Sequence, residues 1–172
     1  MSNSGSNRNK NSKMARNIAD ISFLSKVVIV TGASSGIGKE VAIQFAKLGA
    51  HLSICARNQD NLQKTVQECQ KVLKNPSQKI IALKCDVTNE KDIDSYFKET
   101  MKEFNGQLDV LVNNAGILES GTIENTSLEQ YDRVMNTNVR SIYQLMMLAT
   151  PYLIKTKGMS SLKILIFICF IY

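Results

Sequence analysis

The chain has 172 residues, of which 44% are hydrophobic, so it can bury the core of one domain. Its formal net charge is +6, but lysines alternate with acidic residues along most of the chain, which indicates solvated helix faces and argues against a nucleic-acid partner. The four cysteines form no C-x-x-C pair and the single histidine, His51, has no metal-ligand spacing around it, so the sequence predicts no metal site.

The first 22 residues form a basic tail rich in asparagine and serine, for which we expect disorder. Mitochondrial presequences are also basic and poor in acids, but this stretch lacks the apolar face that would make it amphipathic. It also has no secretory hydrophobic region. We therefore expect a cytoplasmic protein whose cysteines are reduced and buried, with a mitochondrial location as the weaker alternative.

Between residues 23 and 158, short apolar runs alternate with amphipathic stretches. This order predicts an α/β fold, a Rossmann-type doubly wound parallel sheet with helices on both faces. The expected strands are short apolar runs at residues 26–31, 51–56, 79–85 and 108–112. The expected helices have apolar residues three or four positions apart, at residues 36–48, 59–73, 90–104, near Tyr131 and at 139–154.

Local signals set the ends of these helices. Gly49 suits the position just after the first helix, and Thr88 is the expected N-cap of the third. Residues 126–129, with the sequence TSLE, look like a capping box in front of Tyr131. Pro151 is expected to bend the last helix.

The turn between the first strand and the first helix, TGASSGIG, is rich in glycine. A strand that runs through such a turn into a helix presents backbone N–H groups and the positive end of a helix dipole, which together bind a diphosphate. Glycines are needed where a Cβ atom would block the approach of the backbone to phosphate. A glycine cluster alone is also compatible with an ordinary turn. The residues expected to contact a cofactor here are Gly32, Ser34, Ser35, Gly36, Ile37 and Gly38.

The end of the second strand predicts which nucleotide is bound. In a Rossmann fold the residue about 20 positions after the last glycine meets the adenosine ribose, and an acidic residue there favours NAD. This chain has Arg57 at that position, which would pair with the 2′-phosphate of NADP(H). The alternative is a surface arginine at the end of a strand. We expect NADP(H), with NAD(H) as the weaker candidate.

The motifs TGASSGIG, CDVT, LDVLVNNAG and NTNV occur in an order and at intervals that resemble the short-chain dehydrogenase/reductase family, from Phe23 to about residue 158. The resemblance implies that Asp86 faces the adenine with Val87 alongside. It also implies that residues 113–116 line the nicotinamide-ribose side and steady the sheet, with Asn113, Ala115 and Gly116 as cofactor contacts. Some NADP-preferring members carry a basic residue just before the middle glycine, where this chain has Ser35, so Arg57 carries the NADP(H) prediction nearly alone.

The resemblance also implies a catalytic serine, a tyrosine with a lysine four residues after it, and an asparagine. Asn138 matches the asparagine. No tyrosine of the chain is followed four positions later by lysine, the tyrosines being Tyr96, Tyr131, Tyr143, Tyr152 and Tyr172. A missing general acid alone costs about 10²- to 10⁴-fold in rate. We therefore expect this chain to be a truncated form without dehydrogenase activity, and a small carbonyl or alcohol to be its substrate only in a completed form.

Residues 159–172 form an apolar tail with an uninterrupted apolar run at 164–172. That run is nine residues long, whereas a membrane-spanning helix needs about 20. The tail lies where the resemblance places the fifth strand, so a substitute strand is the first interpretation. Aggregation-prone sequence is the second interpretation, and a peripheral membrane contact is the weakest.

Two functions compete on these grounds. In the first, the chain belongs to a nicotinamide-dependent oxidoreductase that interconverts carbonyls and alcohols by hydride transfer. In the second, it is a non-catalytic module that binds NADP(H) or pairs with a homologous subunit through the long helix at 139–154. That helix is rich in leucine and methionine, which is equally compatible with simple core packing.

Overall fold

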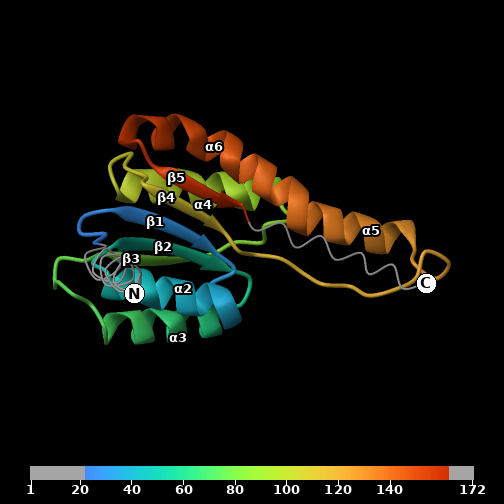
Figure 1. The fold of residues 1–172 in the computed structure, drawn as a ribbon, viewed down its shortest axis with the longest axis horizontal. Helices are drawn as coiled ribbons and strands as arrows, with labels where there is room; N and C mark the ends of the chain where they lie inside the picture. The colour runs from blue at the N-terminus through green and yellow to red at the C-terminus, as the bar shows by residue number, and fades with distance from the viewer. Residues whose placement is uncertain (1–21, 163–172) are drawn as a thin grey trace, which may run out of the picture.

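The computed structural model describes residues 22–162 as a five-stranded parallel sheet with helices on both faces (Figure 1). The strand order is β3-β2-β1-β4-β5. The strands are β1 (Val27–Thr31), β2 (His51–Ala56), β3 (Ile80–Lys84), β4 (Val110–Asn113) and β5 (Met159–Leu162). The helices are α2 (Gly36–Lys47), α3 (Gln59–Gln70), α4 (Glu90–Glu103), α5 (Leu128–Met135) and α6 (Ser141–Thr156), with a π-helical turn η1 (Asn136–Arg140) before α6. The predicted Rossmann-type α/β fold is confirmed.

The central strand β1 is buried on both faces, as its uninterrupted apolar sequence predicts. Val28 and Val30 pack in a core with α2 and α3, whereas Ile29 packs in a second core with α4 and α6. The alternation follows from the two-residue period of a strand, which points successive side chains to opposite faces. Figure 1 shows the same two helical layers on either side of the sheet.

The strand order creates a crevice at the carboxyl ends of β1 and β4. These two strands pair directly, with Val28 opposite Val110 and Val30 opposite Val112. The chain leaves β1 for α2, in one helical layer, and leaves β4 towards α6, in the other. Ligands of doubly wound sheets bind at such a point, because the two departing segments diverge and leave space between them.

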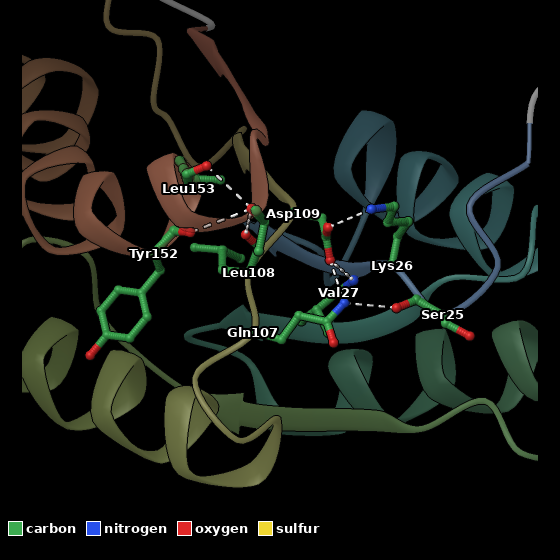
Figure 2. A network of polar contacts seen from close by, with 9 residues as sticks. Ser25, Lys26, Val27, Gln107, Leu108, Asp109, Tyr152 and Leu153 are labelled. Atoms are coloured by element: carbon green, nitrogen blue, oxygen red, sulfur yellow. Dashed lines mark hydrogen bonds and ion pairs between the residues drawn. The ribbon is translucent and has the colours of Figure 1, made fainter.

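The opposite, amino-terminal edge of the sheet is held together by the carboxylate of Asp109 (Figure 2). Its Oδ1 accepts a hydrogen bond from Lys26 Nζ at 2.8 Å. Its Oδ2 accepts from the Val27 amide at 2.9 Å and from Gln107 Nε2 at 2.7 Å. Gln107 Nε2 also donates to the Ser25 carbonyl at 2.8 Å. One buried side chain thus joins the start of β1 to the start of β4.

Because the pKa of Asp109 is lowered in the folded protein, we expect the stability of the fold to depend on pH. Burial disfavours its charged form, but the hydrogen bonds from Lys26, Val27 and Gln107 outweigh burial and lower its pKa. A carboxyl group with a lowered pKa stabilises the fold above its unfolded pKa of about 3.9, and this contribution is lost as the pH falls through the folded value.

We expect Asp109→Asn to lower the free energy of unfolding at pH 7 by about 1–3 kcal/mol, because it removes charge-assisted hydrogen bonds. Urea unfolding at a series of pH values measures the effect, and the difference from wild type should shrink below about pH 4. Asp132→Asn, at an exposed position on α5, is the matched control. A constant difference down to pH 3 would contradict this role of the ionised carboxylate.

Several element ends differ from the predicted ones. The N-cap of α4 is Asn89, whose side chain accepts from the Lys91 and Asp92 amides, so the prediction of Thr88 was wrong. Likewise Ser127 caps α5, one residue after the predicted cap. Neighbouring polar residues compete for a cap, and asparagine and serine are both preferred over threonine at that position.

Helices α5 and α6 are joined without a break by η1, and α6 continues through Pro151. The sheet includes Met159–Leu162, which pairs with β4 in parallel, so it reaches beyond residue 158. The apolar run at 164–172, for which a substitute strand was the first interpretation, lies outside the described residues, as does most of the basic tail. Within residues 22–162 no helix has the length and apolar character needed to cross a membrane.

Candidate cofactor site

A cavity of about 320 Å³ opens at the carboxyl ends of the strands. Three segments that follow strands line most of it: the glycine turn after β1, the end of β2, and the loop after β3. The loop after β4 and one residue of η1 complete the lining. The lining residues are Gly32, Ser34, Ser35, Ala56, Arg57, Asn58, Cys85, Asp86, Val87, Thr88, Asn114, Ala115, Gly116, Ile117 and Thr137.

The glycine turn depends on its glycines for two different reasons. Gly32 and Gly36 have φ angles of +67° and +56°, a left-handed conformation that favours glycine. A Cβ atom on Gly36 would meet nothing within 4 Å, so its surroundings leave room for a ligand to approach the backbone. A Cβ atom on Gly38 would lie 2.2 Å from Asn114 Nδ2 and 2.4 Å from the Gly32 carbonyl oxygen. Gly38 therefore allows α2 to pack against the turn.

The start of α2 is suited to an anion. Its N-cap, Ser35, is extended and makes no capping hydrogen bond, and the first turn contains no acidic residue. The first amides of a helix have no intrahelical acceptor, and the helix dipole adds partial positive charge there. Ile37, in the first turn, is 62% exposed. Because Ser34 and Ser35 line the cavity, this helix end can present its amides to a diphosphate inside it.

Asn114, within the NNAG segment that the resemblance assigns to the nicotinamide-ribose side, holds the two central loops together. Its Nδ2 donates to the carbonyl oxygens of Thr31 and Gly32, at 2.9 and 3.1 Å. In return, Thr31 Oγ1 accepts from the backbone amides of Asn114 and Ala115, both at 3.0 Å. Four hydrogen bonds thus lock the glycine turn after β1 to the loop after β4. The second asparagine of the NNAG sequence thus supplies the contacts by which that segment steadies the sheet.

Arg57 and Asp86 stand at neighbouring strand ends on the rim of the cavity. Asp86 Oδ1 accepts from the Thr88 amide at 2.9 Å and from the Thr88 hydroxyl at 2.8 Å. Burial raises the pKa of Asp86, but these hydrogen bonds and the positive charge of Arg57 lower it overall. The site therefore places an ionised carboxylate beside an exposed guanidinium.

Asn138 braces the far end of the site. Its side chain accepts from the Ile117 amide at 2.9 Å and donates to the Ile117 carbonyl at 2.8 Å. A Cβ atom on Gly116 would lie 3.1 Å from Asn138 Oδ1, so glycine permits the close approach of the two segments. Asn138 lies in the π-helical turn η1, and such turns are frequent at functional sites. Its amide group positions the loop after β4.

The structure brings most of the predicted cofactor residues to one cavity. Those that line it are Gly32, Ser34, Ser35, Arg57, Asp86, Val87, Ala115 and Gly116. The others lie next to it in the chain or behind it: Gly36, Ile37, Gly38, Asn113 and Asn138. Ile117 and Thr137 line the cavity without having been predicted. No group of three or more potential metal ligands occurs within residues 22–162.

A glycine turn that leads into an uncapped helix, placed where the strand order reverses, defines the class of dinucleotide-binding α/β proteins. Comparison with known proteins identifies one family within that class. The family model of the short chain dehydrogenases matches residues 26–164. The chain therefore belongs to the short-chain dehydrogenase/reductase family, whose members are oxidoreductases that bind nicotinamide dinucleotides.

Two curated relatives show how much of each chain the match covers. The 11-beta-hydroxysteroid dehydrogenase-like 4A of Arabidopsis thaliana is 40% identical over 134 residues, which cover 77% of this chain and 44% of the relative. An uncharacterized oxidoreductase of Thermotoga maritima is 38% identical over 138 residues, covering 80% of this chain and 52% of the relative. The chain thus spans about half the length of these relatives.

Solved structures agree with this assignment. A 7α-hydroxysteroid dehydrogenase in complex with NADH and 7-oxo glycochenodeoxycholic acid superposes with a TM-score of 0.75 at 30% identity, covering 84% of this chain and 55% of the other. The apo form of a glucose dehydrogenase of Caenorhabditis elegans superposes with a TM-score of 0.70 at 37% identity. The match covers 80% of this chain and 54% of the glucose dehydrogenase. The matching part again corresponds to about half of each neighbour.

Proposed function

We propose that this chain binds NADP(H) in the cavity at the carboxyl ends of its strands. The observation that carries the proposal is the position of Arg57 on the rim of that cavity, at the end of β2. A guanidinium there can form charge-assisted, bidentate hydrogen bonds with the 2′-phosphate of the adenosine ribose. The preference over NAD(H) rests on this residue.

Each part of the cavity has a role in this binding. The amides at the start of α2 hold the diphosphate, and Asp86 with Val87 faces the adenine. The loop with Asn113, Ala115 and Gly116 lines the nicotinamide-ribose side, positioned by Asn138. The nicotinamide ring, when bound, supplies or accepts a hydride. The roles of these residues are inferred from the family and from their position around one cavity.

We further propose that the whole protein interconverts a small carbonyl compound and an alcohol by hydride transfer, and that residues 1–172 alone do not. These residues contain no tyrosine followed four positions later by lysine. A catalytic tyrosine needs a neighbouring positive charge to lower its pKa from about 10 towards neutrality. Several relatives are named hydroxysteroid dehydrogenases, which is compatible with such a substrate class.

Titration of the purified chain with NADPH, followed by assays with ketones and aldehydes, tests this proposal. We expect NADPH to bind without measurable turnover, because the cofactor residues are present and the tyrosine–lysine pair is not. Turnover at a rate typical of enzymes, about 1 per second or faster, would contradict the proposed inactivity. Absence of binding by folded protein would contradict the cofactor assignment.

A second candidate function is pairing with a homologous subunit through α6. Tyr143, Met147 and Ile154 recur at helical spacing along α6, and their side chains are exposed. A row of exposed apolar side chains on one helix face is typical of an interface. This observation favours pairing over pure core packing for that face, because Leu145, Ala149 and Leu153 already supply the core contacts.

We expect the double variant Tyr143→Asp and Met147→Asp to be monomeric at concentrations where the wild type self-associates, because two charges cannot be buried in an apolar interface. Analytical ultracentrifugation measures the change. The matched control is Lys98→Asp with Lys102→Asp, two exposed positions four residues apart on α4. Unchanged association of the α6 variant would contradict this interface.

We also propose a reducing compartment such as the cytoplasm. Cys55, Cys69 and Cys85 are buried free thiols. Burial raises the pKa of Cys69 to about 11, which keeps that thiol protonated and unreactive.

A further inference from the structure

The amino-terminal edge of the sheet is one continuous surface. All strands are parallel, so every strand begins at this edge, and the helices that lead into β2, β3, β4 and β5 end there (Figure 1). Backbone hydrogen bonds join the strand starts side by side. The His51 amide donates to the Lys26 carbonyl at 2.8 Å. The Met159 amide donates to the Asp109 carbonyl at 2.9 Å. Because neighbouring strands lie about 4.8 Å apart, the five strand starts make a platform about 20 Å wide.

This edge collects the positive charge of the fold. It consists of the residues that lead into each strand, which are 22–27, 47–51, 71–80, 102–110 and 155–159. These ranges contain eight lysines and two acidic residues, a net charge of +6. The remaining residues of the described part, 22–162, contain eight basic and twelve acidic residues, a net charge of −4. The fold therefore separates charges that the linear sequence interleaves.

Helix ends account for only part of this charge. Cations are favourable near the last turn of a helix, where the helix dipole is negative. The lysines in or just after a last turn are Lys47, Lys71, Lys102, Lys155 and Lys157. Lys26, Lys74 and Lys79 lie outside the helices, in the segments before β1 and β3, so the helix dipole does not explain them.

Most of these lysines have no ion pair. Three of the eight, Lys26, Lys79 and Lys102, pair with a carboxylate of the described chain; Figure 2 shows the pair of Lys26 with Asp109. The other five are exposed and form no ion pair within residues 22–162. The edge thus presents unneutralised positive charge to its surroundings.

The two ends of the sequence do not offer the complementary charge. Residues 1–21 contain four basic residues and one acidic residue. Residues 163–172 contain one lysine and no acidic residue. A large negative surface that matches this edge therefore has to come from another molecule.

Apolar side chains lie among the lysines. Leu24 and Met159 are 49% and 62% exposed. Met159 lines a hollow of about 200 Å³ together with Lys26 and Lys157, so an apolar side chain and two lysines share one part of the edge. Lysine keeps its charged end in the headgroup region while its apolar stem, and apolar side chains beside it, reach the boundary of the acyl chains.

We propose that the amino-terminal edge binds the surface of a membrane that contains anionic lipids. The cytoplasmic leaflet of cell membranes is negatively charged, and clusters of about four to eight basic residues bind to it. In this orientation the strands point away from the membrane. The cofactor cavity, at the carboxyl ends of the strands, then stays open to nucleotide.

The residue types of the edge favour a lipid surface over nucleic acid. Arginine forms bidentate hydrogen bonds with nucleic-acid phosphates, and exposed aromatic rings stack on single-stranded bases. Every basic residue of the edge is a lysine, while Phe104 is buried and Phe23 is half-buried. Lysine acts as a point charge without a fixed hydrogen-bonding geometry, which suits a diffuse negative surface. The proposal does not depend on nucleotide binding or catalysis, so its test is independent of the proposed function.

Co-sedimentation of the full chain with lipid vesicles is the first test. We expect binding to phosphatidylcholine vesicles that contain about 30% phosphatidylserine, and no binding to pure phosphatidylcholine. Binding should weaken as the salt concentration rises, because salt screens exposed charges. Absence of binding to the anionic vesicles, or tighter binding to duplex DNA than to these vesicles, would overturn the proposal.

Two matched variants show whether this edge is responsible. Lys47→Gln with Lys74→Gln should lower the partition coefficient about 30-fold, because each lysine at an anionic surface contributes about fivefold. Lys64→Gln with Lys91→Gln removes the same charge at exposed positions near the starts of α3 and α4, away from this edge, and should change it less than fivefold. Residues 1–21 are the same in both variants. Equal losses would show that net charge, and not this edge, drives binding.

Fluorescence tests the orientation at the membrane. The chain contains no tryptophan, so a single introduced tryptophan reports only its own surroundings. We expect the emission of Met159→Trp to shift to the blue with anionic vesicles, and to be quenched by brominated acyl chains, because this position enters the acyl boundary. Leu128→Trp, at an exposed position on α5 beyond the opposite edge, should keep its emission. Equal shifts in both variants, or no shift in vesicle-bound Met159→Trp, would contradict binding through the amino-terminal edge.

Discussion

Gly38→Ala is expected to lower the free energy of unfolding by about 3 kcal/mol, the upper end of the usual cost of overpacking. The added Cβ atom would lie 2.2 Å from Asn114 Nδ2 and 2.4 Å from the carbonyl oxygen of Gly32. One of these atoms belongs to the backbone of the glycine turn, and the other donates two of the hydrogen bonds that lock β1 to β4. Either the turn or the asparagine must move. NADPH affinity should fall together with stability, because α2 then no longer meets the turn in the same orientation.

Two measurements, urea unfolding and NADPH titration, are made on both Gly38→Ala and Gly36→Ala. They distinguish a glycine that is needed for packing from one that is needed for the approach of the ligand. Gly36 has a φ angle of +56° but no atom within 4 Å of its would-be Cβ, so alanine there costs only backbone strain, about 1–2 kcal/mol. We expect Gly36→Ala to lose nucleotide affinity with a smaller loss of stability. Equal destabilisation by the two variants would contradict the view that Gly38 is a packing glycine.

Arg57→Glu is expected to weaken NADPH binding on the order of 100-fold and NADH binding much less. A hydrogen bond to a charged group is worth about 1.5–3 kcal/mol, and 1.4 kcal/mol corresponds to a tenfold change in affinity. The variant also places a carboxylate near Asp86 and opposite the 2′-phosphate, so repulsion adds to the lost contact. NADH lacks that phosphate and loses only the weaker long-range attraction to the guanidinium.

Calorimetric titration with both nucleotides, at one fixed salt concentration, measures the two affinities. Lys98→Glu is the matched control, because it makes the same change of charge at an exposed position on α4, away from the cavity. The unfolding midpoint of each variant shows whether the protein remains folded. Parallel losses of NADPH and NADH affinity in Arg57→Glu would contradict NADP(H) selection by this residue.

Much of the fold could be predicted because it depends on short-range patterns. The uninterrupted apolar sequence of β1 indicated burial on both faces, and the structure confirms it. Spacing of apolar residues predicted α2, α3 and α4 to within a few residues. The choice of caps was predicted wrongly: Asn89 and Ser127 cap their helices, although the neighbouring Thr88 and Thr126 are also of a residue type that caps helices.

By itself the sequence determined the turn between β1 and α2, the glycines within it, and the basic residue at the end of β2. These features depend only on local backbone conformation and on the spacing of residues that are close in the sequence. Only the tertiary structure showed that Asn114 bonds to Thr31 and Gly32, 83 and 82 residues earlier, and that Asn138 bonds to Ile117. The reason is the strand order: placing β4 beside β1 brings together loops that no local pattern in the chain connects.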